Sequence, residues 1–281
     1  MRQILGPFDS PAPALSNPAL PPLIPPGATI GPPPFDARAP KATVGDVQIQ
    51  KPTLFLDAIR KKIRYGPYRL PGVNENNTQA AVMKVNGMMD AIIPGAKKPC
   101  TACTMLLINA DLEYFDGKPA TDQSGAWLHH TVVMNQGPGI TDAVCHKSNM
   151  ESIFESGNEK QPIPLSLGKI PFLKTGYNIK AEDKFTLINE FQNQKDEAQY
   201  VWLTISYEYY DGVHKDFKNT KIIWLSVGPS ICDPTKANPF GASNLTIMGQ
   251  PQNKVFSESS IPWTSFYSGR IIGGGKYTLV D

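Results

Sequence analysis

The feature that most constrains the fold is a series of short runs rich in β-branched and aromatic residues, separated by Gly, Pro, Asn and Asp. These runs include TVGDVQIQ, CTMLLINADLEYF, LHHTVVMN, KFTLINEF and QYVWLTISYEYY. Their composition and partial alternation are typical of strands, and Asp-Gly pairs at 116–117 and 211–212 indicate tight turns. The pattern predicts an all-β fold, an antiparallel β-sandwich that resembles a jelly roll of about 8–10 strands.

Helical periodicity is weak and occurs in two short segments. SNMESIFESG has the spacing of one helical turn that ends at Gly157, and PTLFLDAIRKKI is the second candidate. Both are expected to be minor additions to a β fold.

Residues 1–40 contain twelve prolines and almost no charge. Each proline lacks an N–H and restricts the residue before it, so this segment should be extended and polyproline-like. It is either a disordered tail or an apolar arm that lies along its own domain or along a neighbouring subunit of a homo-oligomer. We therefore divide the chain into a proline-rich arm (1–41), a β-sandwich (42–212) and C-terminal strands and loops that pack on or extend the sandwich (213–281).

The charge balance argues against two classes of partner. With 27 basic and 25 acidic residues among 281, the formal charge is +2 and no long run of one sign is present, which argues against nucleic acid. No apolar stretch approaches the roughly 18 residues that span a bilayer, so a membrane partner is not expected.

Several features favour a secreted protein of the extracellular space or cell wall. Cys100, Cys103, Cys145 and Cys232 are an even set that permits two disulfides in three connectivities, as expected in an oxidising compartment. Asn76 and Asn244 each begin a tripeptide that fits the N-glycosylation pattern. No apolar signal core precedes the prolines, so secretion would require a signal segment that has already been removed.

Two of the four histidines, His129 and His130, are adjacent in WLHHTVVMN. In a regular strand, neighbouring side chains point to opposite faces, so one ring should face the core and the other should not. Either the pair is accidental, or the strand is bent so that both rings converge. Converging imidazoles would be candidate metal ligands.

Other catalytic motifs are missing from the sequence. It contains no G-x-S-x-G elbow, no H-E-x-x-H and no glycine-rich phosphate loop that opens a helix. Cys100 and Cys103 have the spacing of a zinc or thiol-redox motif, but no second C-x-x-C or H-x-H is present to complete a zinc site. A disulfide is the better interpretation of this pair.

From Cys100 to Tyr210 the sequence resembles a family of secreted fungal proteins of undetermined function. The shared motifs are PCTAC, LEYFDG, WLHH, DAVC, ESIFESGNE, GY and VWLTISYEY. That family is similar, more distantly, to the copper type II, ascorbate-dependent monooxygenases, which include peptidylglycine α-hydroxylating monooxygenase. The resemblance implies a β-sandwich fold and copper as the cofactor.

The resemblance also implies a set of metal ligands. In the copper monooxygenases a tandem His-His pair and a third histidine hold one copper, and the tandem pair matches His129 and His130. The third position falls within LINEFQN, where Glu190 or Gln192 occupies it, depending on the register. Both would share one face, because the strand period is two. A carboxylate is a harder donor than Cu(I) prefers, so copper affinity should be weaker.

The second copper of those enzymes needs an H-x-H pair and a methionine. The fungal family continues past a WT..SGRI.G.GG segment into H-x-H-D-G-G, whereas this chain reads WTSFYSGRIIGGGKYTLVD. We therefore expect a secreted fungal sandwich that resembles the N-terminal half of a copper monooxygenase and acts without catalysis, in extracellular binding or assembly through its arm. The alternative is a single-copper oxidase or monooxygenase-like enzyme. Cell-wall glycan binding is a third hypothesis, based on the aromatic residues alone.

Overall fold

The protein is described by a computed structural model for residues 28–83, 85–142, 149–157, 160–166 and 174–222. Twelve strands and one helix occur in these ranges. They are β1 (Thr29–Ile30), β2 (Val47–Gln50), β3 (Ile59–Leu70), α1 (Thr78–Met83), β4 (Met88–Ala96), β5 (Cys103–Glu113), β6 (Ala126–Gln136), β7 (Met150–Ser156), β8 (Ile163–Pro164), β9 (Thr175–Ile179), β10 (Lys184–Asn193), β11 (Gln199–Asp211) and β12 (Lys218–Asn219). None of the helices in this part of the chain has the length and apolarity that a membrane span requires.

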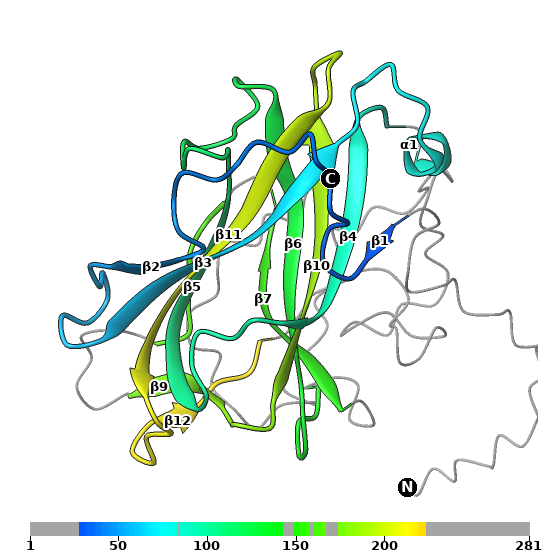
Figure 1. Ribbon diagram of the computed structural model, residues 1–281. Helices are drawn as coiled ribbons and strands as arrows, with labels where there is room; N and C mark the ends of the chain where they lie inside the picture. The colour runs from blue at the N-terminus through cyan, green and yellow to red at the C-terminus, as the bar shows by residue number, and fades with distance from the viewer. Residues whose placement is uncertain (1–27, 84, 143–148, 158–159, 167–173, 223–281) are drawn as a thin grey trace, which may run out of the picture.

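The strands form two sheets that pack face to face (Figure 1). One has the order β1-β4-β10-β6-β7, and the other has the order β12-β9-β5-β11-β3-β2, with β8 beside β5. Pairing is antiparallel except for β1 with β4 and β12 with β9, which are parallel. The predicted all-β sandwich is confirmed, and its sheets are mixed rather than purely antiparallel.

The core lies between the two sheets and is built from the inward-facing residue of each alternating pair. The largest fully buried side chains are Tyr68, Tyr177, Tyr207, Phe154, Phe185, Phe191, Ile63, Leu70, Met105, Leu106, Ile108 and Leu112. Because β10 and β6 are central strands of their sheet, their outward-facing side chains stand on a rigid platform.

Both helical predictions are wrong. SNMESIFESG contains strand β7, which pairs with β6 and buries Ile153 and Phe154 in the core. The second candidate has no helix: its first half is a loop whose backbone N–H groups at Thr53, Leu54 and Phe55 donate to the Glu208 carboxylate at 2.6–2.9 Å, and its second half begins β3. In both segments, strand pairing or hydrogen bonds with distant residues outweigh the local helical spacing.

The helix that does form, α1, follows Asn77. The Asn77 side-chain oxygen accepts hydrogen bonds from the N–H groups of Gln79 and Ala80, at 2.9 and 3.0 Å, which is the usual geometry of an N-cap. Asn and an alanine-containing run after it were the sequence signals for this short helix. The helix places Gln79 against the start of β4.

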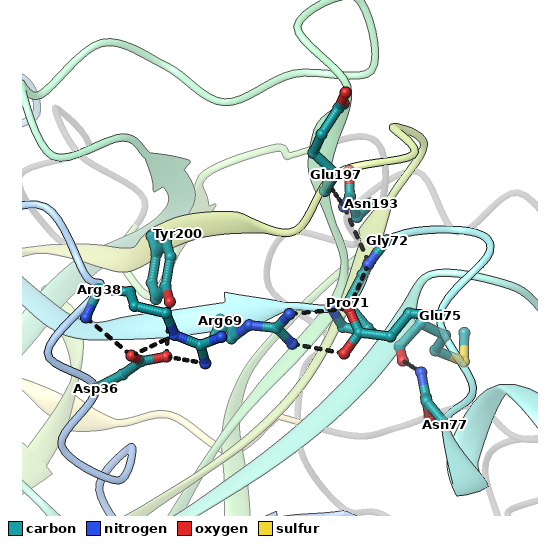
Figure 2. Close-up of polar contacts among 11 residues, drawn as sticks. Asp36, Arg38, Arg69, Pro71, Gly72, Glu75, Asn77, Asn193, Glu197 and Tyr200 are labelled. Carbon is teal, nitrogen blue, oxygen red and sulfur yellow. Dashed lines mark hydrogen bonds and ion pairs between the residues drawn. The ribbon is translucent and has the colours of Figure 1, made fainter.

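The described end of the arm lies along its own sandwich. Thr29 and Ile30 form β1, which pairs with β4 at the edge of the sheet. Farther along, Asp36 accepts hydrogen bonds from the Tyr200 hydroxyl (2.6 Å) and from Arg38, as Figure 2 shows. The Arg38 guanidinium and, after it, the Tyr200 hydroxyl hold the pKa of Asp36 well below its usual range. Self-association through the arm stays a prediction, and residues 1–27 lie outside the described part.

Candidate metal site

Strand β6 alternates regularly except at the two histidines. Leu128, Thr131 and Val133 are buried toward the core. Between Leu128 and Thr131, where a regular strand would have one outward side chain, His129 and His130 both point outward, with 29% and 53% of their side chains exposed. The alternation is therefore interrupted by one extra residue.

The cause is a β-bulge against β10. Glu190 pairs with His130, but the next residue, Phe191, pairs with Leu128, so His129 has no register partner of its own. Bulges of this kind redirect a side chain and are common beside functional sites. The bulge resolves the two alternatives that the sequence left open: the strand is bent and both rings lie on one face, with centroids 4.2 Å apart.

Glu190 joins the two rings. Nδ1 of His129 lies 3.0 Å from Oε2 of Glu190, and Nε2 of His130 lies 3.8 Å from the same oxygen. One ligand atom from each of the three residues lies within 4.8 Å of the others. A carboxylate only accepts hydrogen bonds, so in the tautomer of His129 that donates from Nδ1 to Glu190, Nε2 keeps the lone pair that a metal ligand requires.

The register of β10 against β6 decides between Glu190 and Gln192 as the third ligand. Gln192 pairs with Trp127, one step along the same face, whereas Glu190 stands opposite the histidine pair. Trp127 packs its ring edge-on against His129, with centroids 5.2 Å apart. Met134 is four residues beyond His130, roughly 13 Å along the strand, so it is too far away to add a thioether ligand.

A second carboxylate stands on the other side of Glu190. Asp90 on β4 is the register partner of Glu190 and is 2% exposed. Neither of its oxygens has a hydrogen bond of ordinary geometry, although the Gln79 side-chain amide is close enough to interact with the carboxylate. Burial and, after it, the charge of Glu190 raise the pKa of Asp90 to about 6, while the neighbouring Gln79 amide and His129 act in the opposite direction. Sequence reasoning missed Asp90, although a lone acid in the apolar run MMDAII was a signal.

The donor set fits one redox-active metal ion. Imidazole nitrogen suits copper, and a carboxylate adds a harder, charged donor. The three side chains project from the middle of two central strands, which hold them in place without a loop. Within the ranges that the structure describes, no other group of three or more His, Cys, Asp or Glu residues is close enough to hold a metal.

The remaining predicted site residues are the cysteines and the two candidate glycosylation sites. Cys100 and Cys103 form a disulfide, so neither thiolate is free to bind zinc. Asn76 is exposed just before α1, a position compatible with glycosylation. Cys145, Cys232 and Asn244 lie outside the described residues.

Comparison with known proteins identifies two fungal relatives. The chain is 29% identical over 168 residues to the probable copper-dependent oxygenase M1 of Phoma sp., which is 59% of this chain and 40% of that protein. It is 30% identical over 121 residues to the probable copper-dependent oxygenase clz3 of Cochliobolus lunatus, which is 43% of this chain and 38% of that protein.

No family model and no solved structure matches the chain. The matched region spans about 40% of the length of these curated relatives. The similarity agrees with the copper-oxygenase-like relationship that the sequence motifs predicted. We conclude that this β-sandwich, with two histidines and a glutamate gathered on one face, is distantly similar to fungal proteins named as probable copper-dependent oxygenases.

Proposed function

We propose that the protein binds one copper ion through His129, His130 and Glu190 and acts as the copper-binding part of an oxygenase-like protein. The observation that supports this most directly is the bulge in β6, which turns both imidazoles toward Glu190. An accidental histidine pair would not need this distortion. The names of the relatives favour this function over the non-catalytic binding role that the sequence alone suggested.

The chain's own residues would divide the work at the site. Copper, when bound, supplies a centre that cycles between Cu(I) and Cu(II). Glu190 fixes the orientation of His129 through the 3.0 Å contact to Nδ1. Trp127 covers one side of the His129 ring, and the half exposure of His130 leaves the pair open to solvent and to a small substrate.

The test is metal analysis of the full chain after copper loading and dialysis. Wild type should retain about one copper per chain, and the double variant His129→Ala plus His130→Ala should retain almost none. His214→Ala is the matched control, since this histidine belongs to the turn after β11 and packs on Tyr210 and Phe217 instead. Equal copper content in wild type and the double variant would reject the proposal and leave non-catalytic binding as the better interpretation.

We also propose that the protein works outside the cell. The Cys100–Cys103 disulfide and the exposed Asn76 support this, because disulfides persist in oxidising compartments and N-glycans are added to secreted chains. Protein purified from its natural source should lose mass when it is treated with an enzyme that removes N-glycans. An Asn76→Gln variant should lose less mass if Asn244 also carries a glycan, and none if Asn76 is the single glycosylated residue.

A further inference from the structure

Asp90 extends the candidate metal site beyond the three predicted ligands. We propose that Asp90 is a positioning residue whose negative charge, acting through Glu190, makes the site prefer divalent Cu(II) over monovalent Cu(I). This inference rests on the proposed copper-binding function. It assigns a role to a residue on a third strand, β4, that the sequence motifs do not include.

The first argument is the register of three adjacent strands. Asp90 pairs with Glu190, and Glu190 pairs with His130, so the three residues form one row across β4, β10 and β6. Residues paired directly in antiparallel strands have their Cβ atoms about 4.5–5.5 Å apart and point to the same face. Glu190 therefore stands between a second carboxylate and the two imidazoles.

The second argument is the burial of Asp90 in a place with few polar groups. Its backbone N–H donates to Gln79 Oε1 at 2.7 Å, and the Gln79 side chain also acts on its carboxylate, but neither carboxylate oxygen has a hydrogen bond of ordinary geometry. Gln79 is also 2% exposed, so the carboxylate is enclosed rather than solvated. A buried and poorly hydrogen-bonded carboxylate destabilises a fold, and a purely structural role would be met as well by Asn or Leu. A negative charge at this position therefore contributes more to the neighbouring ligand set than to packing.

The third argument is charge. Asp90 does not belong to the group whose ligand atoms lie within 4.8 Å of one another, so it acts through Glu190 rather than as a direct ligand. Two carboxylates and two neutral imidazoles carry a formal charge of −2, which a divalent ion neutralises and a monovalent ion does not. In a partly buried site this difference weighs more than it would in water. Repulsion between the carboxylates also favours positions of Glu190 that lie toward the histidines.

The experiment compares Cu(II) and Cu(I) affinities of the full-length wild type, Asp90→Asn and Glu155→Gln near pH 8. Glu155 is the matched control: it is a carboxylate on β7 of the same sheet, with a buried oxygen that lacks a partner, but it pairs with Val132 and not with Glu190. For Asp90→Asn we expect Cu(II) affinity to fall about tenfold and Cu(I) affinity to change by less than about threefold. Glu155→Gln should leave both affinities unchanged.

Thermal unfolding without metal gives a second, independent readout. Near pH 8, Asp90→Asn and Glu155→Gln should both unfold at a higher temperature than wild type, because each removes a charge that burial disfavours. Asp90→Ala is the second variant, since it removes the charge without placing an amide beside Gln79, and it should show the same split between Cu(II) and Cu(I).

Unchanged Cu(II) affinity in both Asp90 variants would overturn the inference, as would equal losses for Cu(II) and Cu(I), which indicate general damage to the site. Failure of the underlying function looks different. In that case wild type itself would bind copper no better than the His129→Ala plus His130→Ala variant.

Discussion

The register partner of Glu190 on β6 is His130, and the extra residue His129 shares the same carboxylate oxygen, at 3.0 Å against 3.8 Å for His130. One inserted residue thus converts two adjacent side chains, which a regular strand would separate, into neighbours on one face. The candidate site depends on this local irregularity more than on any motif.

Deletion of His129 should remove the site and keep the fold. Without the extra residue, Leu128 and His130 become neighbours and the strand alternates regularly against β10. All the remaining residues of β6 then keep their present faces. We expect a thermal midpoint close to that of wild type and a loss of copper affinity of at least about tenfold. Thermal unfolding and copper titration measure the two effects.

Deletion of Val132 is the control for this prediction. It shortens β6 by the same length but moves the following residues to the wrong face, so the variant should fail to fold. If the His129 deletion is as damaging as the Val132 deletion, the bulge is a structural requirement of the sandwich and our interpretation is wrong.

Replacement of Glu190 by histidine should shift the site toward Cu(I). The variant places a third imidazole opposite His130 and removes one negative charge, and nitrogen is the softer donor. In Glu190→His we expect the Cu(I) affinity to rise about tenfold. In Glu190→Gln, which loses the charge without gaining an imidazole, we expect the Cu(II) affinity to fall by a similar factor. Competition with chelators of known affinity measures both. A lower Cu(I) affinity in Glu190→His would show that Glu190 does not occupy a ligand position.

The sequence predicted the sandwich because its strands are long and rich in the residue types that pack on pleated surfaces. It did not predict β7, because SNMESIFESG has a weak helical spacing whose outcome depends on pairing with β6. Local pattern and tertiary pairing compete in short segments, and pairing prevailed here.

The candidate site was only partly predictable, because it too depends on pairing between strands as well as on local sequence. The histidine pair is visible in the sequence, but the bulge that joins its rings is defined against β10, so Glu190 and Gln192 could not be separated without the register. Asp90 comes from a third strand, and its relation to Glu190 follows only from the order of strands in the sheet.

Copper binding should quench the fluorescence of Trp127. Its ring lies edge-on to His129 with a centroid distance of 5.2 Å, so a Cu(II) ion held by His129 would be in short-range contact with the indole. We expect Trp127→Phe to abolish most of the quenching. Trp202→Phe should retain it, because Trp202 belongs to β11 in the opposite sheet. Equal quenching in the Trp127 variant would place the ion elsewhere.

The stability of the protein should fall as pH rises toward neutrality, in part because of Glu155. Burial is the main cause that raises the pKa of Glu155 to about 7 from 4.5, the charge of Asp142 adds to it, and a contact with Ser152 opposes it. The folded state therefore binds this proton more tightly than the unfolded state does. The resulting stabilisation is fully present below about pH 4.5 and is lost as pH rises through about 7, a difference of roughly 3 kcal/mol.

Urea denaturation of wild type and Glu155→Gln across this range isolates the effect, because acids such as Asp90 titrate in both proteins. The difference in unfolding free energy between them should grow in favour of the variant from pH 4.5 to pH 7.5, since glutamine has no proton to lose. Parallel pH profiles would mean that Glu155 is solvated in the folded protein. In that case it would no longer be a suitable control for the buried carboxylate of Asp90, and a different buried acid would be needed.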